Sequence, residues 1–421
     1  MKNNILLVIG LILIAGVIVA LSFVMKPMPT KTTLPKSTPE ITTPPEISVP
    51  STTTIAKSIK PDLDQAFDKG LSWLIQKQLP SGSFPDLESK DDVAFTAMTL
   101  IILGGTSESS RLKYKDSLDK GLSYLISRVQ ENGSIMDPGK IPSFDIYKTS
   151  LGIVALKTNL PYRSDDEKKK LDGIISGAVA YLQKSQYGPE SSDKDMGGWG
   201  YKEGGTEKMP NPNLSTTSYV IDALYKAGLE KDSETYKRAV DFLMKIQDSS
   251  EYNKYRVTEN TGGFAYSPVE SKAGEETTPD GKKILKPYGS MTYAGLLSFI
   301  YAYVNKNDPR VQSAYNWIRS KYTLEENPGL RTDAQPNLGK QGLFYYYHTF
   351  AKALDAYGEK KIITTDNKEH LWAEELAAKL ISIQTKDGFW TNDTSRWWED
   401  FPILATSYSL MSLDICRKWI D

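Results

Sequence analysis

The sequence predicts an all-α protein in which six pairs of helices close into a ring, one helix of each pair inside and one outside. Three observations support this fold class. A helix motif recurs six times from Pro61 onward, a more apolar helix follows each copy, and glycine-aromatic turns separate many of the pairs. An open stack of repeats needs polar end caps, and the last repeat ends at the C-terminus without one, so we expect closure.

An apolar run without charged residues extends from Ile5 to Met25. As a helix rising about 1.5 Å per residue it would cross a hydrocarbon core of roughly 30 Å, so we expect residues 1–25 to be a transmembrane signal anchor. The alternative is a cleaved signal peptide, because residues 20–22 form a small-x-small cleavage site. Residues 26–60 are rich in proline, threonine, serine and lysine and are expected to be a disordered linker. This layout predicts a membrane-anchored protein whose ring domain, residues 61–421, lies on the extracytoplasmic side.

Charge and cysteine content exclude several kinds of partner and site. The formal net charge of −1, from 51 basic and 52 acidic side chains, gives no global basic field, so nucleic acid is not an expected partner. Cys416 is the only cysteine, and His348 and His370 are the only histidines. These counts rule out an intrachain disulfide, a cysteine-rich zinc site and a histidine-only metal cage. We expect no metal and no cofactor.

The first helix of each pair is polar on one side and is expected in the outer layer of the ring. Its six copies share an aliphatic position, and four of them carry a glutamine four residues later, one helical turn along the same face. The copies are 70–78, 121–130, 178–186, 239–247, 314–322 and 377–384, and the glutamines are Gln78, Gln186, Gln247 and Gln384.

The second helix of each pair is apolar on most faces and rich in small residues, as a helix inside a ring of other helices would be. The copies are 94–103, 147–156, 215–224, 290–300, 347–356 and 404–413, with register threonines Thr96, Thr149, Thr217, Thr292, Thr349 and Thr406. In the turns between helices, at 81–84, 196–201, 261–266, 341–347 and 387–390, glycine permits a tight turn. The aromatic residue after it is expected to plug the gap between helices.

Residues 384–390, QTKDGFW, match the QxxxGxW repeat of squalene and oxidosqualene cyclases, and residues 78–84, QLPSGSF, match it with Phe for Trp. From about residue 62 to 421 the chain resembles the terpenoid-cyclase and protein-prenyltransferase superfamily, whose catalytic domain is an α/α toroid of six helix pairs. The resemblance implies this fold and a central cavity for an isoprenoid or lipid-like ligand. An enzyme of this type would be a terpenoid cyclase-like isomerase, lyase or transferase.

The catalytic motifs of that superfamily are altered in this chain. Residues 213–218, NLSTTS, stand where the cyclases carry DxDDTA, and each aspartate position is replaced. His348 matches the histidine zinc ligand of the prenyltransferases, whereas Tyr288 and Ser290 stand where the aspartate and cysteine ligands would be. Zinc gains little from a phenol or a hydroxyl, so the resemblance implies no retained metal site.

If the ring closes, the starts of the inner helices meet at one mouth, and the polar and aromatic side chains there form the candidate site. The candidate catalytic residues are Asp92, Asp145, His348, Glu399 and Asp400, and the candidate ligand-binding residues are Tyr288, Tyr345, Tyr347, Trp397 and Trp398. Asp92 and Asp145 each lie four residues before a register threonine, as the first cyclase aspartate does. Their alternative role is to cap a helix.

His348 and the segment RWWED, residues 396–400, have the side chains best suited to catalysis or ligand binding. A histidine has a pKa that is tunable around neutrality and suits acid–base catalysis, although a hydrogen-bonded core histidine is the alternative. Trp397 and Trp398 suit stabilisation of a carbocation or stacking on a sugar or isoprenoid, with Glu399 or Asp400 as the acid. The alternative is a loop packed by tryptophans with solvated acids.

Three functions remain open from the sequence. The first is an enzyme or binding protein for an isoprenoid or another lipid-like small molecule in a central cavity. The second is a non-catalytic binding or scaffold protein on the same fold. The third is a carbohydrate-active enzyme, because six-fold helical barrels also host glycosidases. A deep aromatic pocket would favour the first, a filled centre the second, and an open groove with two carboxyl groups the third.

Overall fold

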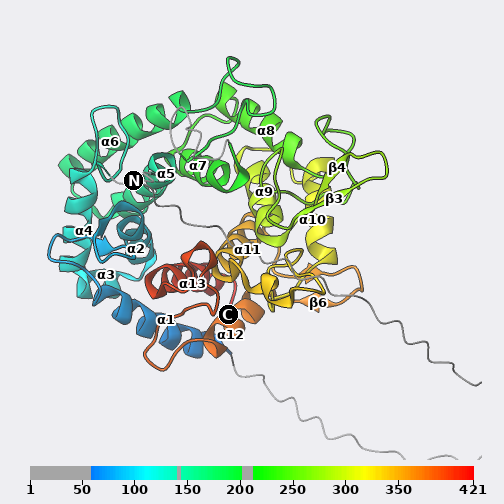
Figure 1. Cartoon of the computed structure of the whole chain (residues 1–421). Coiled ribbons are helices and arrows are strands. Elements are labelled where there is room, and N and C mark those ends of the chain that lie inside the picture. The colour runs from blue at the N-terminus through cyan, green and yellow to red at the C-terminus, as the bar shows by residue number, and fades with distance from the viewer. Residues whose placement is uncertain (1–57, 140–143, 202–211) are drawn as a thin grey trace, which may run out of the picture. The chain divides into compact units, whose positions relative to one another are not determined.

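The computed structural model describes residues 58–139, 144–201 and 212–421, within a compact unit that spans residues 56–421. Six of its helices contact one another in cyclic order and form the inner wall of a ring (Figure 1). In that order they are α2 (Val93–Gly105), α5 (Asp145–Asn159), α7 (Leu214–Ala227), α9 (Gly289–Tyr301), α11 (Leu343–Tyr357) and α13 (Pro402–Arg417). Because α13 packs against α2, the inner wall is closed.

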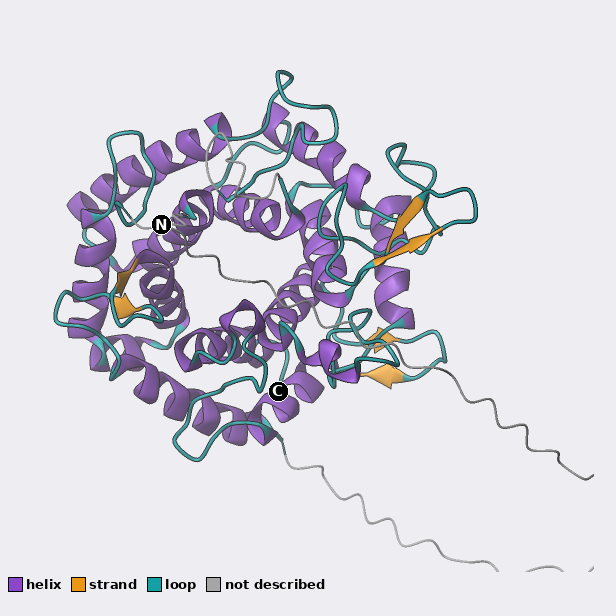
Figure 2. Ribbon diagram, in the orientation of Figure 1, coloured by secondary structure: helices purple, strands orange, loops and turns teal. Residues whose placement is uncertain are grey.

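A second set of helices lies outside the first and encircles it (Figure 2). These are α1 (Lys60–Ile75), α4 (Lys115–Ser127), α6 (Asp165–Lys184), α8 (Glu234–Ile246), α10 (Pro309–Ser320) and α12 (Trp372–Ser382), with the short helix α3 (Glu108–Lys113) before α4. The inner helices are buried on most faces, whereas the outer helices bury one side only. The predicted helical class and the ring of paired helices are therefore confirmed for the described residues.

Short strands and 3₁₀ turns occur in the loops, where no regular structure was expected. Within the described ranges, three antiparallel hairpins pair β1 (Phe84–Pro85) with β2 (Asp91–Asp92), β3 (Glu275–Thr277) with β4 (Lys283–Leu285), and β5 (Ile362–Ile363) with β6 (Glu369–His370). The 3₁₀ turns are η1 (Leu160–Tyr162), η2 (Pro336–Lys340) and η3 (Arg396–Trp398). Of these, the β1–β2 hairpin and η3 lie at the starts of inner helices and so contribute to candidate sites.

The register threonines attach the turns to the inner helices. In the last repeat the backbone N–H of Trp390 donates to Thr406 Oγ1 at 3.0 Å. The same bond joins Phe84 to Thr96, Ile135 to Thr149, Trp199 to Thr217, and Phe264 to Thr292. Thr349 differs, because its hydroxyl donates to the carbonyl of Tyr346. A buried N–H that found no acceptor would cost about 1–3 kcal/mol, which explains why a threonine recurs at this register.

The recurring glutamines join neighbouring outer helices. They lie just beyond the helix ends, not on the helix face as predicted, because the helices end before them. Gln384 Nε2 donates to the carbonyl of Gly388 at 2.7 Å and to that of Ala66 at 2.9 Å. Since Ala66 lies in α1, this bond links the last outer helix to the first. Gln78, Gln186 and Gln247 make the equivalent bonds to a turn glycine and to the next outer helix.

The predicted membrane-anchored, extracytoplasmic localisation must be corrected. No helix in the described ranges is both long enough and apolar enough to cross a bilayer. The apolar inner helices have 13 to 16 residues, fewer than the roughly 20 that a span needs. The longest helix, α6, has 20 residues but carries six charged residues at 165–170. The expected anchor, residues 1–25, and the expected linker up to residue 57 lie outside the described residues.

Candidate functional site

A cluster of four tyrosines, Tyr147, Tyr219, Tyr345 and Tyr408, joins four inner helices inside the ring. The Tyr147 and Tyr408 hydroxyl oxygens are 3.3 Å apart, and the Tyr219 hydroxyl donates to Tyr408 at 3.4 Å. The Tyr345 ring stacks on Tyr219, with centroids 6.4 Å apart, and its hydroxyl lies 3.1 Å from Ser215 Oγ. Burial raises the pKa of each of these phenols, so they remain neutral donors and acceptors.

The cavity beside this tyrosine cluster is small. It lies between Tyr219, Tyr345 and His348 and has a volume of about 10 Å³. This is roughly the space that one water molecule needs. This cavity is therefore too small for an isoprenoid chain.

His348, a predicted catalytic residue, lies in this buried environment. Its side chain is 6% exposed, and its ring stacks on Tyr408 with centroids 5.4 Å apart. Burial, and secondarily the charge of Lys352, lower the pKa of His348 well below 6.5. Nδ1 of His348 has no hydrogen-bond partner among the described residues. The nearby Lys352 instead pairs with Asp222 at 2.6 Å. His348 is thus a neutral imidazole whose Nδ1 is not oriented by any carboxylate of the described residues.

Glu399, another predicted acid, caps the start of α11. Its carboxylate accepts hydrogen bonds from the backbone N–H of Tyr345 at 2.7 Å, from that of Phe344 at 3.2 Å and from Asn392 Nδ2 at 2.7 Å. The N-cap residue Gly342 has no side chain to do this. Burial raises the pKa of Glu399 to about 7, although the hydrogen bonds oppose the rise. Asp400, the alternative acid, points to solvent.

The predicted ligand-binding residues separate into buried and exposed groups. Tyr288 is buried at the start of α9, and Tyr347 is buried with its hydroxyl donating to the carbonyl of Leu324 at 2.6 Å. These two tyrosines pack the protein interior. Trp397 and Trp398 in η3 are 37% and 50% exposed, so part of each side chain is open to solvent.

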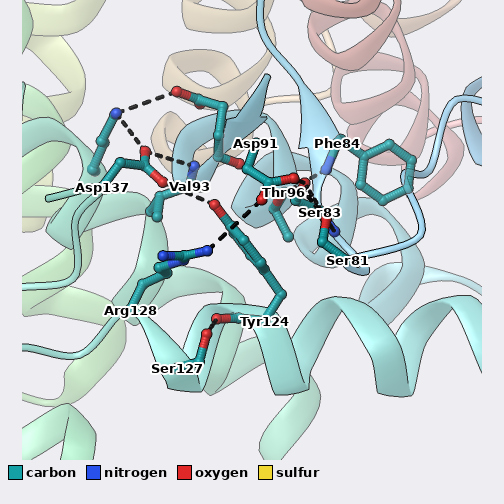
Figure 3. A network of polar contacts seen from close by, with 12 residues as sticks. Ser81, Ser83, Phe84, Asp91, Val93, Thr96, Tyr124, Ser127, Arg128 and Asp137 are labelled. Carbon is teal, nitrogen blue, oxygen red and sulfur yellow. Dashed lines mark hydrogen bonds and ion pairs between the residues drawn. The ribbon is translucent and has the colours of Figure 1, made fainter. Parts of the chain in front are cut away.

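A second polar network surrounds the start of α2 (Figure 3). Asp92, a predicted site residue, accepts from the backbone N–H of Ala94 at 2.8 Å and of Phe95 at 3.1 Å, so it caps α2 as its position predicted. Its other oxygen lies 3.2 Å from Lys148 Nζ, which in turn lies 2.6 Å from Asp137 Oδ2. Lys148 is only 3% exposed, and two carboxylates around one buried ammonium are the compensation that such burial requires.

Asp137 is oriented by three donors. Besides Lys148, the backbone N–H of Val93 donates to its Oδ2 at 3.0 Å, and the Tyr124 hydroxyl donates to its Oδ1 at 2.8 Å. Burial, reinforced by the negative charge of Asp137, raises the pKa of Tyr124 well above 10, so this phenol keeps its proton.

Asp91 borders the same network from the β1–β2 hairpin. It accepts from Ser83 Oγ at 2.5 Å and Ser81 Oγ at 2.6 Å, and the Arg128 guanidinium lies 3.8 Å away. Its side chain is 39% exposed. Asp91, Arg128, Asp137 and Pro138 line an open cavity of about 480 Å³, here called the α2 cleft. This volume lies within the range of small-molecule sites.

The residues expected at a single mouth lie in different environments. Asp92 belongs to the network beside the α2 cleft, and Asp145 lies buried in the first turn of α5. His348 and Tyr345 belong to the tyrosine cluster, whereas Glu399, Trp397 and Trp398 lie where η3 meets α11. The sequence reading missed Asp137, Lys148, Arg128 and Tyr124. Lys148 offered a signal, because a lysine within an otherwise apolar inner helix must find a buried partner.

No family model and no curated protein sequence matches this chain. Several solved structures match its fold. The α-1,6-mannanase GH76A from Salegentibacter sp. HEL1_6 is 12% identical over 85% of this chain and 99% of its own, with a TM-score of 0.53. An inactive variant of that mannanase, with two adjacent aspartates changed to asparagine, has been solved in complex with α-1,6-mannotriose.

Two further structures give the same picture. A family 76 glycoside hydrolase from a bovine Bacteroides thetaiotaomicron strain is 10% identical over 85% of this chain and 78% of its own, with a TM-score of 0.53. A variant of the type II terpene cyclase MstE from Scytonema is 13% identical over 86% and 98%, with a TM-score of 0.50. Both kinds of neighbour are α/α toroids, so the fold is shown. Neither kind defines the activity of this chain.

Proposed function

We propose that this α/α toroid is a carbohydrate-active protein that binds a glycan in the α2 cleft. The observation that carries the proposal is the contrast between two cavities. The α2 cleft is open, polar and about 480 Å³ in volume, whereas the cavity at the tyrosine cluster is about 10 Å³. A hydroxyl-rich ligand needs hydrogen-bonding groups in an accessible groove, and the first cavity offers them.

Two carboxylates in this cleft suit glycosidic chemistry. Hydrolysis of a glycosidic bond uses two carboxyl groups that flank the bond. Asp91 and Asp137 both line the cleft, where Asp91 is partly exposed and Asp137 is held by Tyr124, Val93 and Lys148. In this proposal Asp91 exchanges a proton with the ligand, and Asp137 stabilises the positive charge that develops on the sugar ring.

The mannanase neighbour supports this assignment by analogy. Its inactive variant carries asparagine at two adjacent aspartates. Asp91 and Asp92 are also adjacent, and they immediately precede the inner helix α2. Asp92 is occupied in capping α2 and pairing with Lys148, so Asp91 is the member of this pair that faces the cleft.

Thermal unfolding of the full chain with a ligand panel tests the proposal. At about a hundred times its Kd a ligand adds about 2.7 kcal/mol to the free energy of unfolding, so we expect α-1,6-mannotriose or a longer mannooligosaccharide to raise Tm by several degrees. Asp91→Ala, which removes the side-chain acceptor, should abolish this rise. Asp116→Ala is the matched control, because Asp116 is an exposed acid on α4.

The outcome that contradicts the proposal is equally specific. A Tm rise with a geranylgeranyl compound, together with none for any oligosaccharide, would favour the isoprenoid function that the QxxxGxW resemblance implies. A rise with oligosaccharide that persists in Asp91→Ala would place the glycan outside the α2 cleft. Release of reducing sugar ends from a bound oligosaccharide would then distinguish an enzyme from a binding protein.

A further inference from the structure

The loop before α13 exposes two tryptophans on a strained backbone. Trp397 and Trp398 have φ angles of 58° and 62°, in the left-handed region, which costs an ordinary residue roughly 1–2 kcal/mol. Their side chains are 37% and 50% exposed. The backbone conformation that holds these two adjacent tryptophans in solvent therefore destabilises the free protein. Selection for stability alone would not keep such a conformation.

This loop is held rigidly by buried contacts. Glu399, next in the chain, is completely buried and bonded to the start of α11, and Asn392 bonds both Glu399 and the carbonyl of Lys340 at 2.7 Å each. The Trp397 ring packs on Gly342, where an added Cβ would lie 2.8 Å from Cε3 of that ring. The strained conformation is thus imposed by the surrounding structure and is not an effect of fraying.

A third aromatic residue extends the same surface. Phe144, directly before α5, has a φ of 51°, and its ring centroid lies 6.0 Å from that of Trp398 at an interplanar angle of 80°. The left-handed region is uncommon for residues other than glycine, and for bulky ones it is an outlier. Phe144, Trp397 and Trp398 therefore form an aromatic platform, built from two segments that lie far apart in the sequence.

Charged side chains border the platform. The Arg396 guanidinium lies over the Trp397 ring, 4.9 Å from its centroid, so Trp398 supplies the more open ring, and Asp400 is exposed beside Glu399. The half-exposed Trp398 ring, with Arg396 and Asp400 nearby, matches a sugar ring, which has an apolar C–H face and hydroxyls at its edge. An isoprenoid tail on this open surface would stay largely hydrated and gain less.

The platform is within reach of the α2 cleft. Pro138 lines the cleft, and Phe144 follows it by six residues, which limits their separation to about 20 Å even for a fully extended chain. We infer that the aromatic platform is a separate subsite that stacks a distal sugar ring of an oligosaccharide whose other end occupies the α2 cleft. This inference rests on the proposed function and adds that the ligand is a chain of several sugar units.

Titration calorimetry on the full chain with α-1,6-linked mannooligosaccharides of increasing length tests this inference. Trp398→Ala should weaken binding of the longest oligosaccharide about tenfold, the loss expected for one aromatic stacking contact. If the platform is a separate distal subsite, the variant should leave the affinity for the shortest of these oligosaccharides, α-1,6-mannobiose, within twofold of wild type. Trp398→Phe, which keeps an aromatic face, should recover most of the loss. Trp73→Ala is the matched control, because Trp73 is a half-buried tryptophan on α1 that packs on Phe389.

The other possible results contradict either the distal subsite or the proposed binding of a glycan. Unchanged affinity of Trp398→Ala for every oligosaccharide, with binding abolished by Asp91→Ala, would overturn the platform and leave the proposed function intact. An equal loss for short and long oligosaccharides would also overturn a separate distal subsite. Absence of binding by the wild-type chain to any oligosaccharide would remove the proposed function itself.

Discussion

At the scale of single residues, this protein places several ionisable groups where they are costly. Lys148, Asp92 and Asp137 form a buried triad in which one ammonium faces two carboxylates. Such a group of charges gives little net stability compared with apolar packing, but removal of one member leaves another charge unpaired. A cluster of this kind directly beside an open cleft is consistent with the proposed role of Asp137, because its geometry is fixed by surrounding donors.

Glu399 leads to a prediction about pH. Its pKa is about 7 in the folded protein, above the 4.5 of the free side chain. Between these values the folded state holds a proton that the unfolded state has lost, so stability falls as pH rises from about 4.5 to about 7. The difference corresponds to about 3 kcal/mol in total. Glu399→Gln should therefore flatten the dependence of the free energy of unfolding on pH between 5 and 7.

Urea unfolding at pH 5, 6 and 7 measures this slope. Asp400→Asn is the control, because Asp400 is the exposed neighbour and should leave the slope as in wild type. A slope in Glu399→Gln equal to that of wild type would show that Glu399 is already ionised throughout this range, and that its hydrogen bonds to α11 outweigh its burial.

The sequence predicted where the site residues lie in the repeat better than it predicted which residues they contact. Asp92 was expected at the start of α2, where it caps the helix, yet its partner Asp137 comes from a loop with no repeat signature. Glu399 and Asp400 are adjacent acids in the sequence, and only the backbone conformation of η3 decides that the first is buried and the second exposed. Local sequence contains no information on which loop approaches which helix start.

At the scale of elements, the turns were predicted well because their chemistry is local. Glycine is required at position 388, where φ is 101° and an added Cβ would lie 2.7 Å from Lys69 Cγ and 3.0 Å from the Lys69 carbonyl. Gly82, Gly197 and Gly262 face the next outer helix in the same way. The QxxxGxW pattern therefore reports how one repeat attaches to the next, and for that reason it identifies the fold and not the activity.

Gly388→Ala should destabilise the protein by about 2–4 kcal/mol. About 1–2 kcal/mol comes from the left-handed backbone, and the rest comes from the clash with α1. Gly228→Ala separates the two contributions, because Gly228 has a φ of 85° at the end of α7 with no atom within 4 Å of an added Cβ. Denaturant unfolding should show the larger loss at position 388. An equal loss of unfolding free energy at the two positions would mean that α1 moves to accommodate the added methyl group.

At the scale of the whole molecule, the number and order of helix pairs followed from sequence periodicity, because each pair repeats the same packing problem. The position of the proposed ligand site did not follow. A ring of six similar units offers equivalent positions at each inner-helix start, and small differences among them decide which is open. The aromatic residues that suggested a central isoprenoid pocket instead include tyrosines that bond one another and leave about 10 Å³ beside His348.

Closure of the ring gives the last prediction. Gln78 and Gln384 are matched residues, because each Nε2 donates to a turn glycine and to the next outer helix. Gln78 joins neighbours in sequence, whereas Gln384 joins the last outer helix to the first. If closure makes all repeats equivalent, Gln78→Ala and Gln384→Ala should each cost about 1–3 kcal/mol, the value of two hydrogen bonds, and each variant should unfold in one transition.

An open stack would behave differently under the same substitutions. Its terminal repeats contact one neighbour only and fray first, so loss of the Gln384 bond would cost little or would split the transition in two. Calorimetry of both variants beside the wild type distinguishes these cases. The contacts around the closure support a single transition, since Arg417 in α13 also pairs with Asp64 in α1 at 2.8 Å and Ser58 Oγ donates to the carbonyl of Asp421 at 2.8 Å. In a ring closed by these contacts, unfolding of one repeat removes contacts from both of its neighbours, so all repeats are expected to unfold together.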